Sequence, residues 1–96
     1  MAKERRREGV YGKIRALTAR GDTAGALALA DEWLQKQDDA GLHYLRGNAL
    51  VKAGRRTEAM NAYLHASRLD PDSPAVEALA LWRGIMDFYC KDMYNP

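Results

Sequence analysis

The chain has 96 residues, of which 47% are hydrophobic and 29% are charged, and its formal net charge is +2. A chain of this length forms one domain and buries only about 60 to 65% of the surface that its unfolded form exposes. No apolar run approaches the roughly 20 residues that a membrane-spanning helix needs, so we expect a soluble protein without membrane contact.

The basic residues gather at the N-terminus. Residues 1–20 carry seven basic and two acidic side chains, whereas the remainder carries eight and eleven. The first nine residues, "MAKERRREG", are followed by a segment that contains charged residues and is not apolar, so the N-terminus does not resemble a secretion signal. We expect residues 1–7 to form a solvated, disordered arm. An alternative is that the arm binds nucleic acid through Lys3, Arg5, Arg6 and Arg7. Such binding would weaken steeply with added salt.

Residues with the chemistry of catalysis or metal binding are few. Cys90 is the single cysteine, and His43 and His65 are the two histidines, so we expect no disulfide, no metal site and no cofactor. The sequence contains no glycine-rich phosphate loop, no Gly-x-Ser-x-Gly turn and no His-Glu-x-x-His pair. These features predict a cytoplasmic protein that is not an enzyme.

The pattern of apolar residues predicts an all-α fold. Alanine and leucine recur at helical spacing, and the helical segments are interrupted by Gly21-Asp22, Asp38-Asp39, Gly54-Arg55 and the sequence "DPDSP". Because the connections are short, neighbouring helices should lie antiparallel. Ser73 is expected to cap the last helix, with Pro74 in its first turn. The predicted helices are 8–20, 23–37, 40–53, 57–69 and 74–90, followed by a tail at 91–96.

A comparison of the chain with itself indicates an internal repeat. A shift of 33 residues preserves the glycine that ends one helix and the alanine five residues later. It places Leu17 on Leu50, Gly21 on Gly54, Ala26 on Ala59, Ala30 on Tyr63 and Trp33 on Ala66. Two helical hairpins, followed by one unpaired helix, are therefore expected.

The second hairpin carries a recognisable signature of small, large and aromatic residues. Its members are Gly47, Leu50, Ala59, Tyr63, Ala66 and Pro71. At this spacing the hairpin resembles a tetratricopeptide repeat, and the ending "FYCKDMYNP" resembles that of small stand-alone bacterial members of the family. The resemblance implies a right-handed solenoid over residues 8–90: a degenerate repeat at 8–37, a clear repeat at 40–71 and a capping helix at 74–90.

The second hairpin also departs from the family pattern. His43 and Arg46 stand where the family has tryptophan and leucine, so we expect Leu42 and Leu45 to supply the apolar contacts instead. Tyr44 stands where some members have a lysine that grips a terminal carboxylate, so this clamp is incomplete.

The resemblance implies a concave groove, lined by the first helix of each pair, in which extended peptides bind. An asparagine can bond the main chain of such a peptide, and arginine and lysine favour an acidic group. We therefore expect a non-catalytic protein-interaction module. The groove-facing residues are Tyr11, Arg15, Tyr44, Asn48, Lys52, Ala78, Trp82 and Tyr89.

The last predicted helix suggests an alternative function. Its apolar residues cover an arc of roughly 180°, which is wider than packing against one hairpin requires. Such a face favours burial in the core, a ligand, or a second copy of the chain. The alternative is therefore a structural module that forms a homodimer through Leu79, Trp82 and Met86.

Overall fold

The computed structural model describes residues 2–82, and it describes side chains from residue 8 onwards. Four helices, α1 (Ala2–Ala19), α2 (Thr23–Lys36), α3 (Ala40–Lys52) and α4 (Arg56–Leu69), are followed by a fifth that begins at residue 74 and is still helical at residue 82. No strand occurs in this part of the chain. The predicted all-α fold is thus confirmed. Predictions for Met86, Tyr89 and the tail at 91–96 lie outside the described residues.

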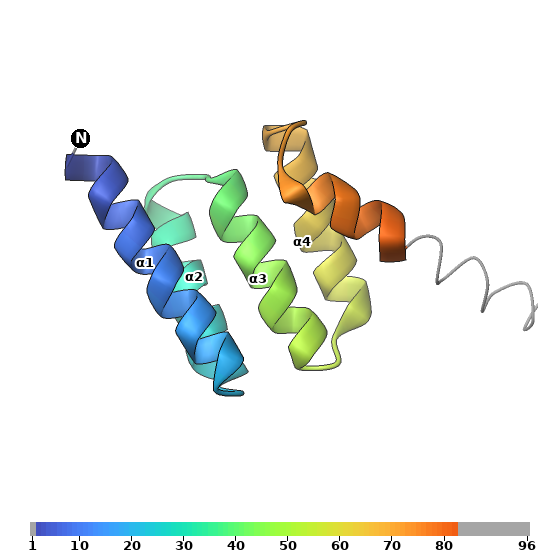
Figure 1. Ribbon diagram of the computed structural model, residues 1–96, viewed down its shortest axis with the longest axis horizontal. Helices are drawn as coiled ribbons and strands as arrows, with labels where there is room; N and C mark the ends of the chain where they lie inside the picture. Colours follow the sequence, from blue (N-terminus) through green and yellow to red (C-terminus); the bar gives the residue numbers. More distant parts are fainter. Residues whose placement is uncertain (1, 83–96) are drawn as a thin grey trace, which may run out of the picture.

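The helices follow one another as antiparallel neighbours. In Figure 1, α1 and α3 lie side by side and run in the same direction, with α2 behind them, and α4 runs back along α3. The fifth helix then turns back at the far end of α4. This order places the two predicted helical hairpins, α1 with α2 and α3 with α4, next to each other.

The turns that close the two hairpins have the same hydrogen-bond pattern. Gly21 and Gly54 both adopt positive φ, 88° and 79°, a conformation that is strained for residues with a side chain. The residue after each glycine donates its backbone N–H to a carbonyl five residues earlier, from Asp22 to Leu17 at 2.8 Å and from Arg55 to Leu50 at 2.9 Å. Since these bonds recur after 33 residues, the shift found in the sequence is confirmed at the turns.

Short polar side chains cap three of the helix N-termini. Asp22 accepts from the backbone N–H of Gly25, and Asp39 accepts from that of Gly41, each at 3.0 Å. Ser73 accepts from the N–H of Ala75 at 3.1 Å. The predicted cap at Ser73 is therefore confirmed, and each cap satisfies a backbone donor that has no partner within its helix.

The core consists mainly of small and aliphatic side chains, which let the helices approach one another closely. Leu42 and Leu45 are buried, as predicted, while Arg46 points outward to Asp31, with its Nε 2.8 Å from Oδ1. The side chains without solvent exposure are Ile14, Ala26, Ala30, Ala49, Leu50, Ala66 and Ala75.

The start of α1 corrects one prediction. Residues 1–7 were expected to be a disordered arm, with the helix starting at residue 8, but α1 begins at Ala2. The physical reason is intrinsic propensity, since alanine, lysine, glutamate and arginine at positions 2–8 are all strong helix formers. The basic N-terminal segment is thus part of the helix.

The closest approach in the second hairpin generates a test of the packing. A Cβ added to Gly47 would lie 2.5 Å from ring carbon Cε1 of Tyr63, a side chain that is almost completely buried. We expect Gly47→Ala to lower the free energy of unfolding by about 1 to 3 kcal/mol, because the buried ring must move. Urea unfolding monitored by circular dichroism measures the change.

The same substitution elsewhere provides the control. Gly12 lies in the interior of α1, and no neighbouring atom would come within 4 Å of an added Cβ. Gly12→Ala should therefore raise the free energy of unfolding by about 0.5 to 1 kcal/mol through helix propensity alone. Equal effects at the two glycines would contradict the proposed packing.

Candidate functional site

The groove residues predicted on the first two hairpins lie on α1 and α3, which are neighbours. At one end, the hydroxyl of Tyr11 donates to the carboxylate of Asp39, the residue that caps α3. A Cβ on Gly41 would lie 2.7 Å from this hydroxyl, so the tyrosine rests directly on the first turn of α3. Tyr11 is therefore a link between the two hairpins as well as a candidate contact residue.

At the other end, a basic residue joins the same two helices. The Nζ atom of Lys52 lies 3.5 Å from the carbonyl oxygen of Ala19, the last residue of α1. Arg15 lies one turn earlier on α1 and is exposed. Both predicted cations thus lie towards the C-terminal ends of α1 and α3, where both are accessible to solvent.

The middle of the surface is organised by Tyr63 of α4. Its hydroxyl donates to Oδ1 of Asn48 at 2.6 Å, and its ring lies 5.9 Å from that of Tyr44, tilted by 41°. Asn48 and Tyr44 remain half-buried. The amide oxygen of Asn48 is therefore occupied, whereas the amide nitrogen has no hydrogen-bond partner among residues 8–82 and can donate to a ligand. The sequence identified Tyr63 as a packing residue only.

The surroundings of Tyr63 keep its hydroxyl protonated. Burial, followed by the nearby Tyr44, raises the pKa of Tyr63 to about 12. The hydroxyl is consequently neutral at all ordinary pH values, and it acts as the donor because the amide oxygen of Asn48 can only accept. Asn48 is thereby held in one orientation, with its N–H groups left for other acceptors.

On the fifth helix, the predicted site residues separate into two environments. Ala78 and Trp82 are half-buried, and the guanidinium of Arg56 lies 5.6 Å from the centroid of the Trp82 ring. Leu79 is only 7% exposed and belongs to the core cluster. Leu79 therefore contributes to the core of the domain, and its part in self-association stays a prediction.

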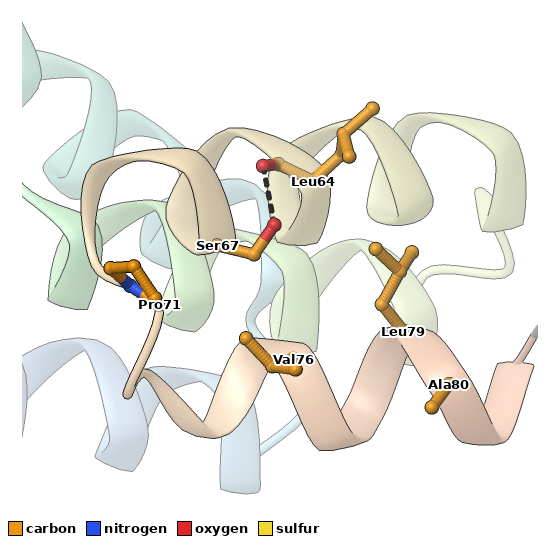
Figure 2. A pocket seen from close by; sticks show the side chains of 6 residues that line it. All are labelled: Leu64, Ser67, Pro71, Val76, Leu79 and Ala80. Carbon is orange, nitrogen blue, oxygen red and sulfur yellow. Dashed lines mark hydrogen bonds between the residues drawn. The ribbon is translucent and has the colours of Figure 1, made fainter.

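A different apolar surface lies between α4 and the fifth helix. Figure 2 shows a groove between these helices, with a volume of about 390 Å³. Val76 at its edge is 40% exposed, and Leu81 nearby in the sequence is 65% exposed. The wide apolar arc in the sequence signalled this surface, but not which residues remain outside the core. The groove is lined by Leu64, Ser67, Pro71, Val76, Leu79 and Ala80.

Sequence reasoning missed one polar cluster. Nε2 of His43 lies 2.6 Å from Oδ1 of Asp38, and Nε2 of His65 lies 3.5 Å from Oδ2 of the same carboxylate. The two imidazole rings stack with their centroids 4.0 Å apart. The hydrogen bond from His43 lowers the pKa of Asp38. The sequence contained the three residues, but nothing in their spacing indicated that they converge.

Comparisons with known proteins identify a solved structure with a similar fold. No helix within residues 2–82 has the length and apolar character needed to span a bilayer. No family model and no curated protein matches the chain. The solution NMR structure of the Bacteroides fragilis protein BF1650 is similar, with a TM-score of 0.78 and 40% sequence identity, and the match covers 88% of each chain.

The raised pKa of Tyr63 predicts how stability depends on pH. Because its folded pKa of about 12 exceeds the value of about 10 for an unfolded tyrosine, the unfolded chain loses this proton first as the pH rises. The stability due to Tyr63 is therefore complete below about pH 10 and is lost between pH 10 and 12. At neutral pH we expect Tyr63→Phe to cost about 1 kcal/mol through the lost hydrogen bond.

Chemical denaturation of both proteins between pH 7 and 12 measures this difference. Wild type should lose its advantage over Tyr63→Phe as the pH approaches 12, while other titrating groups affect both proteins alike. Parallel pH profiles for the two proteins would show that Tyr63 titrates like an exposed tyrosine.

Proposed function

We propose that this chain, which belongs to the same family as the Bacteroides fragilis protein BF1650, is a non-catalytic protein-interaction module. In this proposal, α1 with α2 and α3 with α4 are two tetratricopeptide-like hairpins of a short solenoid. A partner peptide lies across α1 and α3. A reducing, cytoplasmic setting is part of the proposal, since Cys90 has no second cysteine with which to pair.

One observation supports this function most directly. Tyr44 and Asn48 are half-buried side chains whose positions are fixed by Tyr63, yet each keeps part of its surface exposed. Fixing a contact residue before binding reduces the conformational entropy that is lost on binding. The amide nitrogen of Asn48 is then positioned to donate to a backbone carbonyl of an extended peptide.

The charges of the surface indicate the chemistry of the partner. Arg15 is exposed, and Lys52 makes only a 3.5 Å contact with a backbone carbonyl, so both side chains can turn towards an anion. A carboxylate near the C-terminal ends of α1 and α3 would satisfy both of them. We therefore propose that the peptide carries an acidic residue at the end that lies there. Two repeats offer a small interface, so binding should be weak.

A selection from a phage-displayed library of random peptides tests this proposal without a known partner. We expect wild type to enrich acidic peptides, and Asn48→Ala to weaken the selected peptides at least tenfold, because a desolvated hydrogen bond to the main chain is lost. Arg15→Ala with Lys52→Ala should remove the preference for acidic residues. Fluorescence anisotropy of a labelled peptide gives the affinities.

Asn61→Ala provides the matched control, since Asn61 is an exposed asparagine on α4 and lines a hollow formed by α4 residues. Its affinity for the selected peptides should equal that of wild type. The proposal fails if no peptide is enriched, or if Asn48→Ala and Asn61→Ala bind alike.

The exposed apolar surface of the last two helices favours homodimerisation as a second candidate function. Val76 remains exposed at the edge of the groove between α4 and the fifth helix (Figure 2). Leu81 on the fifth helix is 65% exposed, and Leu69 at the end of α4 is 45% exposed. A second copy of the chain packed on these side chains would remove their apolar area from water. In this alternative, Val76 and Leu81 join Leu79, which lines the groove, as contact residues.

Light scattering across a hundredfold dilution tests this alternative. A dimer has twice the mass of the 10.8 kDa chain, and the measured mass should fall on dilution and in the double variant Val76→Ser, Leu81→Ser. Glu32→Gln, an exposed substitution on α2, should leave the mass unchanged. A mass of 10.8 kDa at every concentration would refute the dimer.

A further inference from the structure

We propose that Asp38, His43 and His65 bind a divalent transition-metal ion, with Zn²⁺ as the best-fitting ion. The three side chains come from three elements: the loop between α2 and α3, helix α3, and helix α4. One possible ligand atom of each lies within 4.8 Å of the other two. The site is separate in chemistry from the proposed peptide surface, and it does not depend on that function.

The spacing of the ligand atoms suits a tetrahedral metal. Zinc binds imidazole nitrogen and carboxylate oxygen at about 2.0 to 2.1 Å, so its ligand atoms lie about 3.3 Å from one another. Nε2 of His43 lies 2.6 Å from Oδ1 of Asp38, and Nε2 of His65 lies 3.5 Å from Oδ2, the other oxygen of the same carboxylate, so the two distances lie on either side of this value. The ion would replace the proton that now lies between His43 and Asp38.

Both rings bring an Nε2 atom close to the same carboxylate. The two imidazoles are stacked with an angle of 14° between their planes, and since a bound ion lies in the plane of each ring, the His65 ring must turn out of the stack when the ion binds. The side chain of His43 is only 12% exposed and is held by the helices, whereas His65 and Asp38 are 52% and 54% exposed. One ligand is therefore fixed, and the two exposed ligands can rotate to complete the geometry.

The donor set selects the class of metal. Two imidazoles and one carboxylate match the preference of Zn²⁺ and its neighbours, whereas Mg²⁺ and Ca²⁺ require a site built almost entirely from oxygen. With three protein ligands, the fourth position is left for water, and the bound ion would fasten the loop at Asp38 to both α3 and α4.

Calorimetric titration of the untagged 96-residue chain with ZnCl₂ tests the proposal. The parent protein carries Cys90→Ser, so that the thiol cannot bind the ion, and the titration is run at about pH 7.5, where free imidazoles are neutral. We expect one ion per chain, at least tenfold weaker binding in His65→Gln and in Asp38→Asn, and no binding of MgCl₂. Asp72→Asn, another exposed loop carboxylate, should bind like the parent.

Imidazole ¹⁵N NMR of the parent gives a readout that does not depend on any variant. Coordination should shift the Nε2 signals of both His43 and His65 on zinc addition, and a chelator should reverse the shifts. The proposal is overturned if the parent binds no zinc, if His65→Gln binds as tightly as the parent, or if either histidine signal stays unchanged at saturation. In those cases the cluster is a hydrogen-bonded contact only.

Discussion

The contact between Tyr63 and Gly47 is the constraint on which the second hairpin and its surface depend. Because Gly47 has no side chain, the ring of Tyr63 fills the space that a Cβ would occupy, and α3 and α4 come close together. The hydroxyl then reaches Asn48, and the ring contacts Tyr44. This one contact in the core therefore sets the positions of Tyr44 and Asn48 on the surface.

Features governed by local chemistry were predictable from the sequence. Gly21 and Gly54 end their helices because each adopts positive φ, and the same residue pattern appears at both places. The burial of Leu42 and Leu45 followed from helical spacing, since they lie on one face of α3. The start of α1 was missed because a run of charged residues was interpreted as disorder, although each of those residues favours a helix.

Features that depend on which side chains meet across helices were not predictable. The sequence placed Asn48 on the correct face of α3 but could not show that its oxygen is taken by Tyr63. Likewise, the apolar arc of the fifth helix contained both Leu79, which is buried, and Leu81, which is exposed. The meeting of Asp38, His43 and His65 requires the packing of α4 against α3, and no local pattern encodes it.

The two links between α1 and α3 have different strengths, and this difference has a mechanical consequence. At one end, the half-buried Tyr11 is bonded to the cap of α3, whereas at the other end Lys52 makes a long, exposed contact with Ala19. The contact between the two hairpins is therefore stiffer at the Tyr11 end than at the Lys52 end. Bending should separate α1 from α3 first at the contact between Lys52 and Ala19. The curvature of the surface is therefore adjustable at the end that carries Arg15 and Lys52.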